Sequence, residues 1–240
     1  MDRLLLIIIR NLIIIPQEYL KLRKYANLSN NYTEEERYRY FQTIFQKAVR
    51  TGNIDLKVYG QENIPKENGF MLYSNHQGKF DILSIVLTCD NPIGVVFKKE
   101  LYSNHFVKLL VDSTSSFPID RENTKQSMSV IRRVIEELKK GRNYLIFPEG
   151  ETSKSNQMTD FHTGSFRCAI KTHCPIVPIA LIDSFKPFNE KGCRKTQVQI
   201  HYLPPIYYNE YKNMTSTDLA LLVRERINQT IEAFYEQGFF

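Results

Sequence analysis

The chain has 240 residues, of which 42% are hydrophobic and 24% are charged, and its formal net charge is +6. A chain of this length can bury a sizeable core, as one domain or as one domain with an appendage. Much of the positive charge lies in the first thirty residues beside a strongly apolar segment, so a membrane surface is favoured over a nucleic acid as partner. The four cysteines lack both metal-like spacing and disulfide density, and reduced thiols are expected.

The N-terminal segment is apolar over residues 4–9 and 12–15. As a helix, twelve residues rise about 18 Å against a hydrocarbon core of about 30 Å, so a simple transmembrane span is not expected. A signal peptide is not expected either, because no small-residue cleavage site follows. We predict a helix in the membrane interface, with Lys21, Arg23 and Lys24 at the headgroups, on a peripheral or monotopic protein at the cytoplasmic face of the cell membrane. The alternative is a helix packed on the rest of the protein.

A second helix is predicted from residue 33, because Thr33-Glu34-Glu35-Glu36 has the pattern of a capping box. Four apolar residues then recur at helical spacing before Gly52 ends the pattern: Tyr38, Phe41, Phe45 and Val49. This aromatic face can pack on the domain or lie in the membrane with the first helix. The predicted division is an N-terminal helical membrane-association segment, 1–52, and an α/β domain, 53–240.

From residue 54 strand and helix patterns alternate, which predicts an α/β fold with a mixed, largely parallel sheet flanked by helices. The expected strands are 54–59, 69–74, 93–97, 116–119, 144–147, 176–182 and 197–203. The expected helices are 80–89, 100–111, 124–140, 163–173 and 216–235. The strand 197–203 alternates apolar and polar residues and is a candidate edge strand, and residues 184–196 read as an exposed connection.

The segment from Ser74 to Asp81 carries the strongest chemical signal. His76 and Asp81 are five residues apart, and on one helix that spacing would turn them roughly 500° and hold them apart. They can meet only if His76 lies in the turn after a strand and Asp81 on the first turn of the next helix. The carboxylate would then orient the imidazole as a base. The rival interpretation is a loop histidine beside an aspartate that favours a helix start.

Two further segments end apolar runs in the same way, Phe117-Pro118-Ile119-Asp120-Arg121 and Phe147-Pro148-Glu149-Gly150. Open α/β sheets bind ligands at the carboxyl ends of their strands, so His76, Arg121 and Glu149 are expected at one rim.

With the Asn75-His76 to Asp81 segment, in this order, these segments resemble the glycerolipid acyltransferase family, most closely the 1-acylglycerol-3-phosphate acyltransferases. The resemblance covers residues 55–203 and includes residues 96–101 and 177–180. It implies transfer of a fatty acyl group from acyl-CoA or acyl carrier protein to the sn-2 hydroxyl of 1-acylglycerol-3-phosphate, giving phosphatidate. The acyl donor is a substrate, and neither a cofactor nor a metal site is expected.

The resemblance also implies roles for individual residues. His76 is the general base, Asp81 orients it, and Glu149 completes the catalytic set by binding a hydroxyl or holding a cation; a structural role for Glu149 is the alternative. Arg121 would bind the acceptor's phosphate, against the rival of an ion pair with Asp120 or Glu122. Four further residues are expected to bind substrate: Asn75, Gly150, Ser153 and Lys154.

One departure from the family concerns the third segment, where Glu151-Thr152 stands in place of the usual Thr-Arg. Lys154 could supply the lost charge, although an ammonium lacks the bidentate fork of a guanidinium. A different lysolipid acceptor is therefore the alternative. A catalytically inactive membrane-binding relative is a separate rival, and the presence of His76, Asp81, Glu149 and Arg121 together argues against it. A serine hydrolase is disfavoured, because the chain has no Gly-x-Ser-x-Gly motif.

Overall fold

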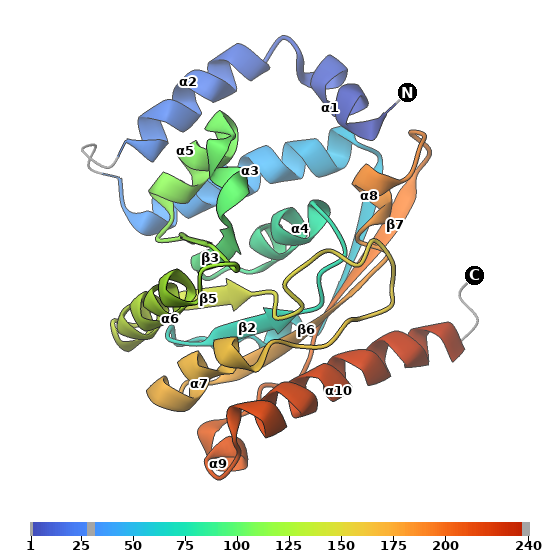
Figure 1. The fold of residues 1–240 in the computed structure, drawn as a ribbon. Coiled ribbons are helices and arrows are strands. Elements are labelled where there is room, and N and C mark those ends of the chain that lie inside the picture. The colour runs from blue at the N-terminus through green and yellow to red at the C-terminus, as the bar shows by residue number, and fades with distance from the viewer. Residues whose placement is uncertain (1, 28–31, 237–240) are drawn as a thin grey trace.

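One seven-stranded sheet runs through the computed structural model, which describes residues 2–27 and 32–236 (Figure 1). Its strands are β1 (Ile54–Tyr59), β2 (Met71–Ser74), β3 (Ile93–Lys98), β4 (Phe117–Ile119), β5 (Asn143–Ile146), β6 (Ile176–Ile182) and β7 (Thr196–Tyr202). Their spatial order is β1-β7-β6-β2-β5-β3-β4. The five strands from β6 to β4 are parallel, whereas β7 is antiparallel to β6 and parallel to β1. The predicted mixed, largely parallel sheet is confirmed.

Helices cover both faces of the sheet (Figure 1). On one face are α1 (Arg3–Asn11), α2 (Ile15–Ala26), α3 (Glu34–Thr51), α4 (Phe80–Thr88) and α5 (His105–Ser113). On the other are α6 (Thr124–Lys139), α7 (Arg167–Thr172), α9 (Tyr208–Tyr211) and α10 (Ser216–Glu236), and α8 (Lys186–Asn189) lies between β6 and β7 in the chain. Strand β2 shows why both layers are needed. Leu72 faces α3 and α4, while Met71 and Tyr73 face α6, α7 and α10, so no side of this strand meets water.

Helix α3 belongs to the core of the domain. Its N-terminus has the predicted capping box, in which Thr33 Oγ1 accepts from the Glu36 N–H at 3.2 Å and Glu36 Oε2 accepts from the Thr33 N–H at 2.7 Å. Tyr38, Phe41 and Phe45 are buried in one cluster with β2 and α4. The aromatic face therefore packs on the domain, which was one of its two predicted positions, and the division of the chain at residue 52 stays a prediction.

The prediction of β7 as a candidate edge strand is wrong, because β1 pairs with residues 196–201 of β7 and the edges of the sheet are β1 and β4. The alternation in β7 arises from burial of its two faces. Val198 and Ile200 are fully buried on one face, whereas His201 on the other is partly exposed. A half-covered face produces the same pattern as a sheet edge, so periodicity alone does not separate them.

Smaller differences concern helix ends. The predicted helix 100–111 is a 3-10 turn (Lys99–Ser103) followed by α5, because Asn104 leaves the helix and its Oδ1 accepts from the Val107 N–H at 3.2 Å. The predicted helix 163–173 likewise divides into a 3-10 turn (Thr163–Phe166) and α7. Within 184–196, expected to be an exposed connection, Ser184 and Pro187 are buried.

Helix α1 is attached to the domain through a buried arginine. The Arg3 guanidinium donates to the carbonyl oxygens of Gly52 at 2.6 Å, Pro187 at 3.0 Å and Arg194 at 3.0 Å. Leu6 is buried beside it, but most of the apolar side chains around α1 are exposed: Leu4, Leu5, Ile8, Ile9, Leu12 and Ile13. In the part of the chain that the structure describes, no helix combines the length and apolar character needed to cross a membrane.

Candidate active site

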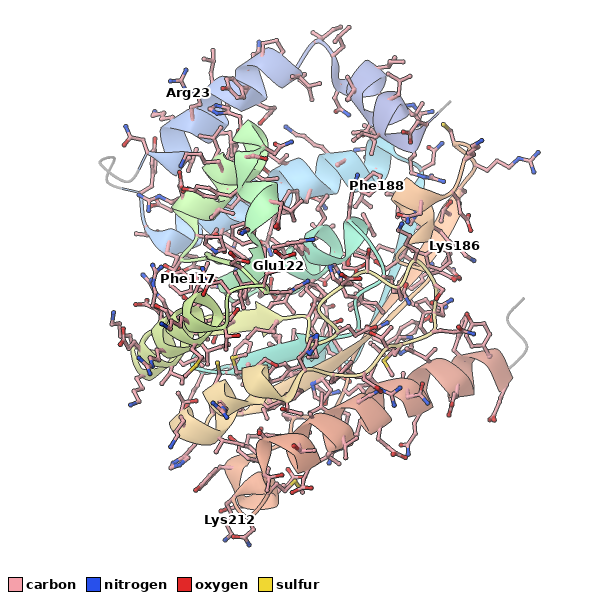
Figure 2. The ribbon with its side chains drawn as sticks, viewed as in Figure 1. Arg23, Phe117, Glu122, Lys186, Phe188 and Lys212 are labelled. Atoms are coloured by element: carbon pink, nitrogen blue, oxygen red, sulfur yellow. The ribbon has the colours of Figure 1, made fainter. Side chains whose placement is uncertain are left out.

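Four segments meet at the carboxyl edge of the parallel strands. His76 follows β2, Glu149 follows β5, Arg121 follows β4 and Ser184 follows β6. Strand β2 lies between β6 and β5, so the His76 turn is flanked by the segments that carry Ser184 and Glu149. In Figure 2, Glu122 marks the turn that follows β4, and Lys186 and Phe188 mark α8, which follows Ser184.

His76 and Asp81 form the predicted pair. His76 Nδ1 lies 2.7 Å from Asp81 Oδ2, with His76 in the turn after β2 and Asp81 on the first turn of α4. Since a carboxylate only accepts hydrogen bonds, Nδ1 carries the proton and Nε2 is the nitrogen that can take one. The His76 side chain is 17% exposed and its ring stacks on Phe147 with centroids 4.1 Å apart. Asp81 therefore holds the imidazole at Nδ1 and Phe147 holds one face of its ring, while part of the ring remains accessible to solvent.

The Asp81 carboxylate is fully buried and surrounded by donors. Its Oδ2 also accepts from the backbone N–H groups of Gln77 at 2.6 Å and Gly78 at 2.9 Å, and its Oδ1 accepts from Ser184 Oγ at 2.6 Å. These bonds compensate for burial of the charge and fix the direction of the carboxylate. Ser184 was not a candidate from the sequence, in which only its position just after a strand could have suggested it.

Glu149 holds the backbone of the site in place. The side chain is buried, and its Oε1 accepts from the His76 N–H at 2.7 Å. Its Oε2 accepts from the Thr159 N–H at 2.7 Å and from Thr159 Oγ1 at 2.9 Å. Both oxygens thus accept hydrogen bonds from the protein, and binding of a substrate hydroxyl or a cation by Glu149 stays a prediction. The structural alternative fits the geometry, and Glu149 is a positioning residue for His76.

Asn75 also has a structural contact where a substrate contact was expected. Its amide pairs with Leu181 of β6 on both sides, donating to the carbonyl oxygen at 2.9 Å and accepting from the N–H at 2.8 Å. The side chain is buried and ties the end of β2 to β6, and a contact of Asn75 with substrate stays a prediction.

The loop after Glu149 lies directly on the His76 turn. The Ser153 N–H donates to the His76 carbonyl oxygen at 2.8 Å, and the Lys154 N–H donates to that of Gln77 at 3.2 Å. Ser153 Oγ donates to the Ser155 carbonyl oxygen at 2.8 Å, whereas the Lys154 side chain is exposed. The structure brings both residues to the site by their backbones, and side-chain contacts of either with substrate remain a prediction.

Arg121 lies at the same rim, with its side chain exposed in part and its guanidinium half-buried. Its predicted rival partner Asp120 is instead paired with Lys99 at 2.5 Å, and no ion pair joins Arg121 to another described residue. Desolvation lowers the pKa of Arg121, and Glu151 and Glu100 act against that shift by stabilising the charged form. Arg121 is therefore a cation near carboxylates but not bonded to one.

Gly150 connects the Arg121 side of the site with a residue that sequence reasoning missed. Its φ is +85°, a conformation that favours glycine. A Cβ placed on Gly150 would lie 2.9 Å from His162 Nε2 and 3.8 Å from Cζ of Arg121. The imidazole of His162 therefore occupies the space that a side chain at position 150 would need.

Other nucleophiles near the core are inaccessible. Ser74 is fully buried and its Oγ donates to the Asn75 carbonyl oxygen at 3.0 Å. Burial raises the pKa of the Cys89 thiol to about 12 and that of Cys174 to about 11, so neither is a thiolate at neutral pH. Within residues 2–27 and 32–236, three or more His, Cys, Asp or Glu side chains do not gather as a metal site would require.

Comparison with known proteins gives consistent matches. Residues 55–182 match the acyltransferase family. The chain is 31% identical over 179 residues to the 1-acyl-sn-glycerol-3-phosphate acyltransferase of Salmonella typhimurium, covering 73% of each chain. It is 28% identical over 180 residues to the enzyme of that name from Bacillus subtilis, covering 74% of this chain and 86% of the relative. The crystal structure of the 1-acyl-sn-glycerophosphate acyltransferase of Thermotoga maritima has the same fold, with a TM-score of 0.76, 21% identity, and coverage of 95% and 97%.

Proposed function

The chain belongs to the acyltransferase family that includes the 1-acyl-sn-glycerol-3-phosphate acyltransferases, and from that premise we propose that it acylates the sn-2 hydroxyl of 1-acylglycerol-3-phosphate. The product is phosphatidate, and the acyl donor is a thioester of coenzyme A or of acyl carrier protein. The observation that carries the proposal is the 2.7 Å contact between His76 Nδ1 and Asp81 Oδ2, which leaves Nε2 as a base at the rim of the sheet.

The reaction requires a base because an alcohol is a weak acid, whereas a thiol with a pKa near 8.5 leaves readily. His76 Nε2 takes the proton of the sn-2 hydroxyl while the hydroxyl oxygen forms a bond to the thioester carbonyl carbon. The tetrahedral intermediate then collapses and the carbon–sulfur bond breaks. The departing sulfur accepts the proton from the imidazolium. Asp81 keeps the imidazole oriented and stabilises its charged form during the transfer. No acyl-enzyme is formed.

Arg121 is the group proposed to bind the acceptor's phosphate. A guanidinium binds phosphate oxygens bidentately, and Arg121 is exposed without an ion-pair partner among the described residues. Gly150 lies between Arg121 and Glu149, and Glu149 accepts from the His76 backbone. The segment Glu149-Gly150 therefore connects the proposed phosphate-binding residue, Arg121, with the proposed base, His76.

The exposed apolar surface formed by α1 and by the turn that follows it, residues 12–14, is proposed to bind the membrane that supplies the acceptor. Ile13 is 89% exposed and Leu12 63%, and an apolar face of this kind inserts into the headgroup boundary of a bilayer. Lys21, Arg23 and Lys24 on α2 are also exposed, and Arg23 lies on the outward side of α2 in Figure 2. These cations would contact anionic headgroups.

The test is turnover by the purified protein with 1-acylglycerol-3-phosphate, offered with acyl-CoA and with acyl carrier protein in separate reactions. Lysophosphatidylcholine serves as the second acceptor, because Glu151-Thr152 replaces the usual Thr-Arg. The expected result is phosphatidate formation that is abolished in His76→Ala. If the protein acylates lysophosphatidylcholine alone, acyl transfer is retained as the reaction and 1-acylglycerol-3-phosphate is rejected as the acceptor. If no combination of donor and acceptor gives turnover, the proposed function is rejected.

A further inference from the structure

We infer that His162 is a second phosphate-binding residue of the acceptor site, acting beside Arg121 on the same phosphomonoester. The inference deepens the proposed function and rests on it. His162 precedes the 3-10 turn Thr163–Phe166 and is exposed. It would supply the donor that an arginine at position 152 would otherwise provide.

The backbone of His162 is held firmly at the end of β5. Its N–H donates to the Pro148 carbonyl oxygen at 2.8 Å, and its carbonyl oxygen accepts from Ser165 Oγ at 3.1 Å. The preceding residue, Phe161, is buried in the core. The backbone of His162 is therefore fixed relative to the end of β5, and its exposed imidazole is accessible to a ligand at this rim.

The position of the ring points to the same place as Arg121. His162 Nε2 and Cδ2 each lie 2.9 Å from the point where a Cβ of Gly150 would be, and the Arg121 Cζ lies 3.8 Å from that point. Residue 150 can only be small here, because any side chain would displace the imidazole. The glycine therefore allows a ring nitrogen and a guanidinium to approach one short stretch of backbone.

The local charge also calls for a second donor. A phosphomonoester carries about −1.5 to −2 charges at neutral pH. Arg121 contributes one positive charge, and the carboxylate of Glu151 acts on that same guanidinium. Thr152 contributes no charge, Lys99 is paired with Asp120, and Lys154 can add one positive charge but lacks the bidentate fork of a guanidinium. An imidazole offers an N–H donor in both of its protonation states, so His162 can bind a phosphate oxygen either way.

A binding assay separates this role from catalysis. In a His76→Ala background, which removes the proposed base, the affinity for 1-acylglycerol-3-phosphate in detergent micelles is compared with that for 1-acylglycerol, which lacks the phosphate. Adding His162→Ala should weaken binding of the phosphate lipid roughly ten- to a hundred-fold, the range for one hydrogen bond to a charged group. Binding of 1-acylglycerol should change less than about twofold, within the uncertainty of such contacts.

Steady-state kinetics provide the second measurement, in the otherwise unchanged protein. His162→Ala should raise the acceptor KM and leave the donor KM and the limiting kcat nearly unchanged, and His162→Gln, which keeps a donor, should recover part of the loss. The matched control is His173→Asn, an exposed histidine that stacks on Tyr208 and precedes β6 at the opposite edge of the sheet. Asparagine tolerates the φ of +59° at that position.

Three results would overturn the inference: unchanged affinity in His162→Ala, equal weakening for both lipids, or a raised donor KM with an unchanged acceptor KM. Equal weakening would mean that the ring only supports Gly150, and a donor effect would mean that the phosphates of coenzyme A bind there. If the wild-type protein fails to acylate 1-acylglycerol-3-phosphate, the proposed function fails, and the binding comparison still decides the role of His162.

Discussion

Ser184 Oγ donates a 2.6 Å hydrogen bond to Asp81 Oδ1, and both residues are fully buried. The bond joins the segment after β6 to the first turn of α4, while the other oxygen of the same carboxylate accepts from His76. Ser184 therefore helps the Gln77 and Gly78 N–H groups to orient the carboxylate that holds the proposed base. Removing Ser184 is expected to loosen that carboxylate while leaving the imidazole itself in place.

Ser184→Ala is expected to lower kcat and to destabilise the fold. Leaving one oxygen of a buried carboxylate without its donor costs about 1–3 kcal/mol in the free energy of unfolding. Denaturant unfolding measures that cost, and kcat and KM for both substrates show whether the loss is confined to kcat. Ser184→Thr keeps the hydroxyl and should restore most of the activity. If Ser184→Ala unfolds more easily but turns over normally, Ser184 supports the fold and not the His76–Asp81 pair.

His76→Ala is expected to abolish most of the turnover in a folded protein. General-base catalysis supplies about 10²–10⁴-fold in rate, so kcat should fall at least by that factor. Asp81→Asn should lose less, because the imidazole remains while its tautomer and orientation are disturbed. Turnover at saturating donor and acceptor is the measurement, with circular dichroism as the folding control. Near-normal turnover in a folded His76→Ala protein would remove His76 from the mechanism.

Arg121→Ala is expected to weaken binding of the acceptor and to leave binding of the acyl donor nearly unchanged. Loss of a hydrogen bond between charged groups costs about 1.5–3 kcal/mol, so the acceptor KM should rise roughly ten- to a hundred-fold. Lys154→Ala should act in the same direction more weakly, because an ammonium lacks the bidentate fork. Thr152→Arg should improve the KM for 1-acylglycerol-3-phosphate and have little effect with lysophosphatidylcholine. A raised donor KM in Arg121→Ala would place the guanidinium on the thioester side.

The double variant Ile9→Ser, Ile13→Ser is expected to bind vesicles less well than the wild-type protein. Both side chains are exposed, so the fold should persist, and burial of each is worth about 1.5–3 kcal/mol when complete. Co-sedimentation with anionic vesicles should show a loss of at least about tenfold in partitioning. Point substitutions are preferable to deletion of α1, because Arg3 bonds the helix to the domain.

The matched control for the vesicle-binding experiment is Leu221→Ser. Leu221 is an exposed leucine on α10, on the opposite face of the sheet. Its vesicle binding should equal that of the wild-type protein. Salt should weaken wild-type binding, because each basic residue near an anionic surface contributes about 1 kcal/mol. Undiminished binding by the double variant would locate the membrane contact elsewhere on the chain.

The sequence by itself determined the elements and the pair at the centre of the site. Periodicity specified the seven strands, because alternation and apolar runs reflect which faces are buried. The five-residue spacing of His76 and Asp81 specified that one lies in a turn and the other on a helix, because no continuous helix brings them together. These are local relations, and the residues that decide them are neighbours in the chain.

Only the tertiary structure decided which partners those residues have. Ser184 is 103 positions from Asp81, Glu149 is 73 from His76, and Asn75 is 106 from Leu181. Each contact exists because β6 and β5 flank β2, and that strand order is chosen by competition among all possible pairings of the sheet. The same order placed β7 inside the sheet, although its alternation was consistent with an edge. A pattern records the burial of a residue, whereas a hydrogen bond also needs the position of a partner that is distant in the chain.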